Sequence, residues 1–447
     1  MPVVYGSSAS ISCMSCSSIY SSIIPSHECS EWRSSTVIHS HTKQQNNTCT
    51  KLHRESQFKM IKVVVVGSGY GGAAVAKHLN KSYFGAAVFK HLNKAKNVEV
   101  TVIDRRQAQI HKIGALRGAV QGGGWKDAVL VPRDKLVKNG KFVQGAVKSI
   151  ESKEKKVVME DGTEHTFDYL VCATGATNRS IGEPVQQALS KPELDAYFST
   201  AAAAIKKAEN ITIIGGGVVG VELAGEIRYK YPKKKITIVH SGKELLDSQP
   251  MPLGPEFQKK MQSLINQQDV DLVLGDKAKI DFADFSDSAF KVVDQPVELA
   301  SGKTVPSDLI ILSVGVSLNN SIYPESFLDQ NGSIKVQPNL LVENENCIFA
   351  VGDITNIAEN KMAYFAAQHG KVVANNIVNL GNGKTASKQY KPGSSPFMLV
   401  PFGPKLGLSV TPLGVAGSFM TSNIKGKSLF LSIAWKDNNQ PTPKPSL

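Results

Sequence analysis

The apolar positions of the chain fall into two similar series of strands and glycine-rich turns. Ile61–Val66 is an almost continuous β-branched run, which is typical of a strand buried on both faces of a parallel sheet. A glycine-rich turn, a predicted crossover helix and a second apolar strand, Val98–Ile103, follow it. The same order recurs where Ile211–Ile214 leads through another glycine-rich turn and helix into Ile236–Val239. This alternation predicts an α/β fold with parallel sheets.

Both series carry the spacing GxGxxG directly after their first strand. The glycines are Gly67, Gly69, Gly72, Gly215, Gly217 and Gly220. In such a loop the first glycine permits a tight turn, the second lets a diphosphate approach the backbone, and the third lets helix and strand pack closely. Asp104 ends the second strand, where an acid binds the ribose hydroxyls of an adenosine. Two such loops, about 150 residues apart, predict two bound dinucleotides.

The first crossover segment repeats itself. Gly72–Lys81 and Gly85–Lys94 differ only at Ala76 versus Phe89, at an offset of thirteen positions. Thirteen residues rotate a helix by about 220° beyond whole turns, so the apolar faces of the two copies would point in largely opposite directions. Both cannot bury against one sheet. We therefore predict a break or looped-out excursion near Ser82–Gly85, with one copy only partly packed.

The net charge of +13 adds little to this interpretation. Clusters such as Lys153–Lys156 and Lys233–Lys235 suit either acidic lipid or nucleic acid, or simply a solvated basic surface. No aromatic residues are interleaved with the basic ones, so no nucleic-acid partner is expected. No apolar run reaches the ~20 residues that span a bilayer. Four of the six cysteines lie in the first fifty residues, which fits a reducing compartment for the rest.

The N-terminal segment, residues 1–60, is Ser-rich, lacks periodicity and is predicted to be a disordered tail. It carries no charged residue before Glu28, so it matches neither a secretory signal nor a mitochondrial presequence. The chain begins Met-Pro, which excludes the N-terminal glycine needed for myristoylation. We expect a cytoplasmic, non-secreted protein without a transmembrane helix, and peripheral attachment to a membrane or mitochondrion is left open.

Two further apolar strands end in short motifs. Phe167–Gly175 ends in Ala-Thr-Gly, and Cys347–Asp353 ends in Gly-Asp. Together with the paired glycine loops, these motifs resemble the pyridine-nucleotide-dependent flavoprotein reductases. The resemblance implies that the first loop binds FAD, that the second, in an inserted unit, binds NADH or NADPH, and that Asp353 hydrogen-bonds the ribityl chain of the flavin.

The order and spacing of several other segments indicate a particular subfamily of these reductases. They are His111, Ala115–Arg117, Gly220–Glu226, Tyr231–Lys233, Ile238–Ser241, Lys361–Tyr364, Tyr390–Gly393 and Lys427–Lys436. These look like the apoptosis-inducing-factor-like, mitochondrion-associated subfamily, whose members are also described as ferroptosis-suppressing NAD(P)H:quinone reductases. The match extends from Ile61 to about Gln440. It implies an enzyme that transfers a hydride from NAD(P)H to FAD and then electrons to a quinone-type acceptor.

The resemblance also assigns cofactor contacts. For FAD they are Gly67, Ser68, Gly69, Tyr70, Gly71, Gly72, Asp104, Arg117, Val143, Thr174, Gly175, Gly352 and Asp353, and for NAD(P)H they are Gly215, Gly217, Gly220 and Glu222. Arg117 matches an arginine that contacts the cofactor, and a surface salt bridge is the alternative. The backbone of Val143 is expected to border the adenine.

Three residues are implied to act in catalysis. Glu222 is expected to face the nicotinamide, although a carboxylate near a helix N-terminus also stabilises the helix dipole. Lys361 is expected to open a helix whose positive end faces the flavin and stabilises the negative charge that develops there on reduction. His111 is expected near the flavin and the quinone, with a purely structural histidine as the alternative. No metal site is expected.

The sequence departs at two places from the patterns of other pyridine-nucleotide-dependent flavoprotein reductases. His240-Ser241 stands where an NAD site has a ribose-binding acid, and no obvious arginine for a 2′-phosphate is present, so the choice between NADH and NADPH stays open. The first unit has no CxxxxC pair, and Cys172 stands alone on its strand. This argues against dithiol chemistry, so electrons would leave through the flavin to a quinone, another small acceptor or oxygen.

The predicted architecture has two Rossmann-like dinucleotide-binding domains and a small C-terminal α+β module. The ranges are 1–60 for the tail, 61–183 and 305–384 for the FAD domain with its duplicated segment 72–94, 184–304 for the inserted NAD(P) domain, and 385–447 for the module. The apolar runs of the module could cover the flavin, meet a membrane or a second copy in a homodimer, or pack on their own core. Reduction of a protein electron carrier and redox-gated signalling are the alternative functions.

Overall fold

The computed structural model describes residues 60–84, 98–184, 189–247, 252–393 and 397–447. The predicted disorder of the N-terminal tail and the second copy of the repeat lie outside these residues. No helix among the described residues is both long and apolar enough to cross a bilayer.

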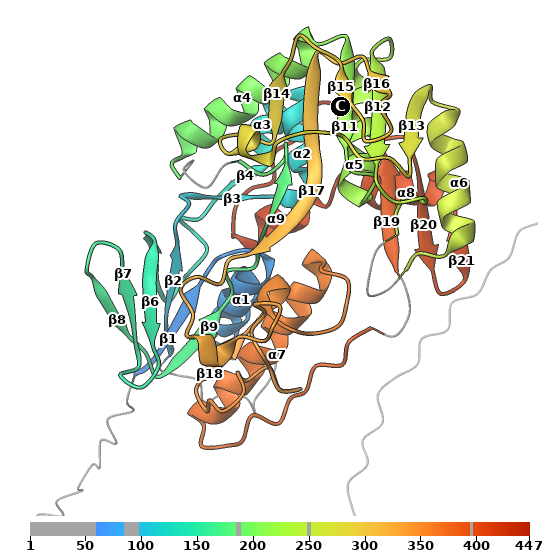
Figure 1. Cartoon of the computed structure of the whole chain (residues 1–447). Helices are drawn as coiled ribbons and strands as arrows, with labels where there is room; N and C mark the ends of the chain where they lie inside the picture. The colour runs from blue at the N-terminus through green and yellow to red at the C-terminus, as the bar shows by residue number, and fades with distance from the viewer. Residues whose placement is uncertain (1–59, 85–97, 185–188, 248–251, 394–396) are drawn as a thin grey trace, which may run out of the picture. The chain divides into compact units, whose positions relative to one another are not determined.

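The first parallel sheet is built from five strands of the described chain, in the order β18-β9-β1-β2-β5. The strands are β1 (Ile61–Val66), β2 (Val98–Asp104), β5 (Gly140–Gln144), β9 (Tyr169–Cys172) and β18 (Ile348–Ala350). Val63 and Val65 face helices α1 (Tyr70–Phe84) and α7 (Ala363–Gly381), while Val64 and Val66 face the opposite core. The strand buried on both faces that the β-branched run predicts is therefore present (Figure 1).

Helix α1 contains the first copy of the repeat. Its side chains Val75, Ala76 and Leu79 are buried, and the helix packs closely along α7 (Figure 1). A Cβ added to Gly370 of α7 would lie 2.7 Å from the Cβ of Ala74. Helix α1 ends at Phe84, and the second copy lies beyond the described part of the chain.

The second sheet contains the other glycine loop. Its strands are β10 (Ala176–Ser180), β17 (Leu309–Leu318), β11 (Asn210–Ile214), β12 (Lys235–His240) and β13 (Val270–Leu274), in that order, with β14 (Phe290–Val292) paired to β17. Helices α4 (Lys191–Lys207), α5 (Val218–Lys230) and α6 (Pro255–Asn266) share a core with it. The first part of β17 pairs in parallel with β11 and the second part antiparallel with β10. Hence β10 and β17, which the predicted boundaries place in the FAD domain, hydrogen-bond within the second sheet.

The remaining elements are small. They are β3 (Ala108–Ile110), α2 (Lys112–Gln121), α3 (Gly123–Ala128), β4 (Leu130–Pro132), β6 (Val147–Glu151), β7 (Lys156–Met159), β8 (Glu164–Thr166), β15 (Val297–Glu298), β16 (Thr304–Val305) and the 3₁₀ helices η1 (Phe282–Phe285), η2 (Glu325–Phe327) and η3 (Gly352–Ile354). Strands β6, β7 and β8 form an antiparallel sheet.

The C-terminal part, residues 397–447, contacts both the unit built on the first sheet and the unit built on the second sheet. It contains the antiparallel strands β19 (Met398–Phe402), β20 (Leu406–Thr411) and β21 (Gly414–Ala416), and then α8 (Ser418–Thr421), the π-helix η4 (Ser422–Gly426) and α9 (Leu431–Asp437). A Cβ on Gly225 of α5 would lie 2.5 Å from Phe402 Cα, so β19 lies directly on that helix. Trp435 Nε1 donates to the carbonyl of Ala128 at 2.8 Å. The strands therefore pack on the second unit, and α9 reaches α1 of the first unit through the ion pair between Lys77 and Asp437.

Candidate functional site

The first glycine loop is tightly packed at its ends and open at its centre. Gly67 has a φ of +96°, and a Cβ there would lie 2.3 Å from the carbonyl oxygen of Ala173. A Cβ on Gly72 would lie 2.0 Å from the carbonyl oxygen of Gly67. A Cβ on Gly69 would meet no atom within 4 Å. This opening at the start of α1 is where a diphosphate would approach the backbone.

The second glycine loop has the same geometry. Gly215 has a φ of +119°, and a Cβ on Gly220 would lie 1.9 Å from the carbonyl oxygen of Gly215. A Cβ on Gly217, the N-cap of α5, would meet no atom within 4 Å. Two loops with the same closed and open positions fit two dinucleotides.

Asp104 lies at the carboxyl end of β2, beside the first loop. Its carboxylate accepts hydrogen bonds from Ser68 N at 2.8 Å, Ser68 Oγ at 2.6 Å and Arg106 N at 3.0 Å. Burial alone would raise the pKa of Asp104, but the Arg133 guanidinium and these hydrogen bonds hold it below its usual range. The carboxylate is therefore ionised and fixed next to the loop. Val143 lies at the end of the adjacent strand β5, and its contact with adenine stays a prediction.

The Ala-Thr-Gly motif is anchored to the end of β17. Thr174 Oγ1 donates to the carbonyl of Asn319 at 2.8 Å, and Asn319 N donates to the carbonyl of Gly175 at 3.0 Å. Gly175 adopts a φ of +64°. Because Gly67 packs on Ala173, the motif forms one wall of the first glycine loop.

The Gly-Asp motif forms the opposite wall. A Cβ on Gly71 would lie 2.9 Å from Val351 Cγ2, and Gly352 N donates to His369 Nδ1 at 3.1 Å. Asp353 follows in η3, and its carboxylate forms no hydrogen bond within the described part of the chain. Burial raises the pKa of Asp353, although Lys112 and Lys361 oppose the shift. An open, partly buried acceptor of this kind fits the hydroxyls of a flavin side chain.

Lys361 lies near this acid but does not open the helix as predicted. Helix α7 begins at Ala363, with Met362 as its N-cap. The Lys361 ammonium donates to the carbonyls of Thr355 at 2.8 Å and Ile357 at 2.9 Å. These two carbonyls hold the ammonium on the loop after η3.

His111 is buried, with both ring nitrogens hydrogen-bonded. Its Nδ1 lies 3.0 Å from Tyr70 Oη, and its Nε2 lies 2.7 Å from the carbonyl oxygen of Leu429. Because a carbonyl only accepts, Nε2 carries the hydrogen and Tyr70 donates to Nδ1. Burial lowers the pKa of His111 to about 4, so the ring is neutral near pH 7. This arrangement agrees with the structural alternative: His111 joins α1 to the C-terminal part.

Arg117 is fully buried and its guanidinium is engaged within the protein. It forms a bidentate pair with Glu226, with Nε–Oε2 at 2.9 Å and Nη2–Oε1 at 2.7 Å. It also donates to the carbonyls of Gly426 at 2.6 Å and Lys427 at 3.0 Å. The predicted cofactor contact, and the alternative of a surface salt bridge, are both wrong here, because no face of the side chain is exposed.

Glu222 lies one helical turn before Glu226 on α5 and is also buried. Lys425 Nζ donates to its Oε1 at 2.7 Å and to the carbonyl of Leu399 at 3.1 Å. Burial raises the pKa of the Glu222 carboxyl, and Lys425 opposes that shift. Glu222 thus pairs with a cation that the C-terminal part supplies.

Beside the second glycine loop lies a cavity of about 270 Å³, where the adenosine of a dinucleotide on this loop is expected. Its lining includes Gly215, His240, Ser241 and Lys277. Gly216 N donates to His240 Nδ1 at 3.3 Å, so Nε2 carries the hydrogen, and Nε2 is buried 3.7 Å from a carboxylate oxygen of Asp247. A histidine thus stands where the ribose-binding acid of an NAD site was expected.

Four residues with a place in these sites were not predicted from the sequence. They are Arg179, Lys277, Phe282 and Lys425. A lone lysine or phenylalanine carries no local signal, because it becomes functional only through distant partners. Arg179 had one indication, since it lies shortly after the Ala-Thr-Gly motif.

Comparisons with known proteins agree with this geometry. The chain is 34% identical to apoptosis-inducing factor homolog B of Dictyostelium discoideum, over 86% of the chain and 98% of that protein. It is 31% identical to ferroptosis suppressor protein 1 of Taeniopygia guttata, over 86% and 97% respectively. The sulfide:quinone oxidoreductase structure from Aquifex aeolicus superposes with a TM-score of 0.62 at 18% identity, covering 85% of this chain and 92% of that one.

A family model described as pyridine nucleotide-disulphide oxidoreductase matches residues 61–370, which include both glycine loops and the Ala-Thr-Gly and Gly-Asp motifs. The predicted α/β fold, with Rossmann-type dinucleotide-binding units, is confirmed. The cofactors of this chain are FAD and NAD(P)H. This chain belongs to the pyridine nucleotide-disulphide oxidoreductase family and is similar to its apoptosis-inducing-factor and ferroptosis-suppressor members.

Proposed function

We propose that this oxidoreductase transfers a hydride from NAD(P)H to FAD and passes the electrons to a quinone-type acceptor. The observation that carries the proposal is the pair of glycine loops. In each loop the first and last glycines have no room for a side chain, and the middle glycine faces open space. Bound FAD would supply the redox chemistry, and the protein would supply binding, orientation and electrostatics.

The first loop, Asp104 and Asp353 would hold FAD. Gly69 leaves space for the diphosphate, and Asp104 stands ionised beside it. The open carboxylate of Asp353 would accept hydrogen bonds from the ribityl chain. The ammonium of Lys361 lies close enough to affect the Asp353 pKa and would add positive charge beside the flavin.

Glu222 and Lys425 would form the polar contact at the hydride-transfer end of NAD(P)H. Glu222 lies on α5, five residues after the open glycine at the helix N-terminus, so a dinucleotide bound there passes along this helix. Lys425 holds the carboxylate in one position, which would orient the nicotinamide. Their role toward the cofactor rests on this placement.

A quinone fits the acceptor role because the described cysteines offer no dithiol. Cys172 and Cys347 are both free and buried, and burial raises the pKa of each thiol. An unreactive thiol of this kind does not relay electrons, so they would leave directly from the flavin.

The proposal is tested with purified protein. We expect a flavin absorption spectrum and consumption of NADH or NADPH that accelerates when a ubiquinone analogue is added. Glu222→Gln should lower the quinone-dependent rate about tenfold while flavin content is retained. Glu256→Gln, on the exposed face of α6, is the matched control and should leave the rate unchanged. A flavin-loaded protein that reduces only a protein electron carrier, or nothing, would refute the quinone assignment.

We also propose that the C-terminal part meets a membrane surface, from which a lipophilic quinone is taken. Leu413, in the turn between β20 and β21, is 100% exposed, and Phe419 on α8 is 87% exposed. Vesicles of phosphatidylcholine and phosphatidylserine should retain the protein, and the Leu413→Ser/Phe419→Ser variant should bind several-fold more weakly. Val292→Ser, which removes another exposed apolar side chain on β14, is the control. Equal retention of all three proteins would contradict membrane contact, and a monomer–dimer difference in sedimentation would assign the surface to a homodimer.

A further inference from the structure

Arg179 lies at an irregularity in the pairing of β10 with β17. Asn178 pairs with Val316 and Ser180 with Ser313, so the register shifts across Arg179. Gly315 of β17, in the facing segment, has a φ of +82°. Bulges of this kind redirect a side chain and are frequent next to active sites.

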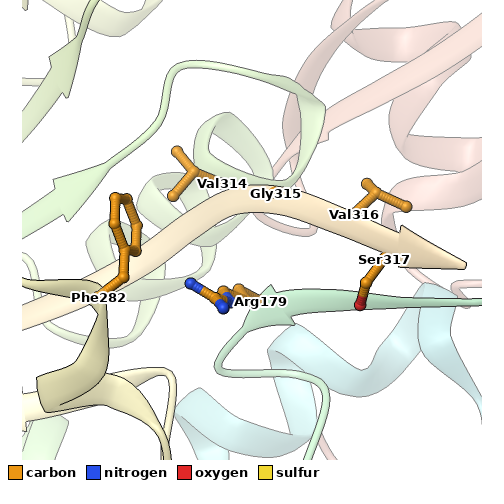
Figure 2. Close-up of a pocket in the computed structure, with 6 residues that line it drawn as sticks. All are labelled: Arg179, Phe282, Val314, Gly315, Val316 and Ser317. Carbon is orange, nitrogen blue, oxygen red and sulfur yellow. The ribbon is translucent and has the colours of Figure 1, made fainter.

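At this irregularity Arg179 lines a cavity of about 260 Å³, together with Phe282 and the Val314–Ser317 segment of β17 (Figure 2). The guanidinium carbon lies 5.4 Å from the centre of the Phe282 ring, a cation–π arrangement. The side chain is exposed, and within the described part of the chain it forms no hydrogen bond or ion pair. Arg179 is therefore a cation that contacts an aromatic ring and lacks an anionic partner among the described residues.

This cavity adjoins the NAD(P) site. Phe282 and Val314 line both the Arg179 cavity and the adenosine cavity that contains His240. A Cβ on Gly215 would lie 2.4 Å from the carbonyl oxygen of Ser313, so the second glycine loop packs directly on β17. Phe282 and Val314 thus connect the cavity that contains Arg179 to the cavity beside the second glycine loop.

A cation at this place would add to the attraction that the helix N-terminus exerts on a bound diphosphate. The N-terminus of α5 contributes a partial charge of only about +0.5. The first turn of α5 contains no basic residue. A guanidinium presents a planar fork of donors that binds a phosphate bidentately.

We propose that Arg179 binds the phosphate on the nicotinamide side of the NAD(P)H diphosphate, with Phe282 holding the guanidinium in place. The adenosine-side phosphate would stay on the glycine loop. This inference rests on the proposed function only in placing NAD(P)H on the second glycine loop, and it does not depend on the electron acceptor.

The test is calorimetric binding of adenine nucleotides to the FAD-loaded protein at fixed ionic strength. ADP and ADP-ribose contain the second phosphate, and 5′-AMP lacks it. Arg179→Gln should weaken ADP and ADP-ribose about tenfold and 5′-AMP less than twofold. Arg179→Lys, which keeps the charge but loses the fork, should give an intermediate loss. Lys259→Gln removes one exposed charge from α6 and should change no affinity.

Three results would overturn the proposal. They are equal weakening of 5′-AMP and ADP, unchanged binding of all three ligands, and a loss confined to ADP-ribose with ADP unaffected, which would place Arg179 on the second ribose. Failure of quinone reduction alongside the expected ADP result would leave this inference standing and refute only the proposed acceptor.

Discussion

Single residues of the second unit decide how it recognises its cofactor. His240 ends β12, where an acid would exclude a 2′-phosphate, and its buried Nε2 lies 3.7 Å from a carboxylate oxygen of Asp247. Asp276 lies in the same cavity, but its carboxylate accepts hydrogen bonds from Ser301 N and from Lys277 N. The exposed ammonium of Lys277 is then the side chain best suited to a phosphate on the adenosine ribose.

Replacing Lys277 should therefore alter the preference between NADPH and NADH. We expect Lys277→Ala to raise the KM for NADPH about fivefold to tenfold, because one charge-assisted contact is lost, with the KM for NADH within twofold. Lys279→Ala, which removes a lysine paired with Glu298 outside the cavity lining, should change neither value. The prediction is wrong if both cofactors lose affinity equally in Lys277→Ala.

At the scale of elements, a neutral histidine connects α1 to the C-terminal part, beside the ion pair between Lys77 of α1 and Asp437 of α9. Tyr70, His111 and the carbonyl of Leu429 form a buried chain of hydrogen bonds. Folding lowers the pKa of His111 from 6.5 to about 4, so the unfolded chain binds the proton more readily. Its contribution is complete above about pH 6.5 and is lost as the pH falls toward 4.

This predicts a specific loss of stability in acid. Between pH 7.5 and 4.5 the wild-type protein should lose roughly 2–3 kcal/mol of unfolding free energy more than His111→Gln, which cannot gain the charge. Denaturant unfolding at several pH values measures the difference and cancels the contributions of shared carboxylates such as Asp104. Parallel curves for the two proteins would show that His111 does not titrate on unfolding.

The repeat allows a second prediction at this scale. Deleting Ser82–Lys94 or deleting Gly72–Phe84 leaves chains of equal length that differ only by Ala76 versus Phe89 at one helical position. That position is fully buried in α1, so a phenylalanine there overpacks the core by about 1–3 kcal/mol. We expect the first deletion to keep a flavin spectrum and the higher melting temperature. Identical melting temperatures would mean that the first copy does not occupy this site.

For the whole molecule, two buried ion pairs on α5 join distant parts of the chain. Arg117 of α2 pairs with Glu226 and also donates to the carbonyls of Gly426 and Lys427, and one turn earlier on α5 Glu222 pairs with Lys425. Removing one partner of such a pair leaves a buried, uncompensated charge.

Arg117→Met should lower the unfolding free energy by about 3–5 kcal/mol for this reason. Adding Glu226→Leu should recover a large part of the loss, because both charges are then absent. Lys260→Met, which breaks the exposed pair with Glu256 on α6, should change stability by less than about 1 kcal/mol and is the control. A double variant no more stable than Arg117→Met would contradict this account.

The order of strands and helices and the identity of both glycine loops follow from the amino-acid sequence, because they depend on neighbouring residues and on one short spacing. The partners of Arg117 and Lys425 do not, since Glu226 lies 109 positions from Arg117 and Glu222 lies 203 positions from Lys425. The same holds for β17, which the linear boundaries place with the first unit although its hydrogen bonds lie in the second sheet. Only folding brings such groups together. Once they are buried, charged residues of a type that usually lies on the surface form ion pairs that join distant parts of the chain.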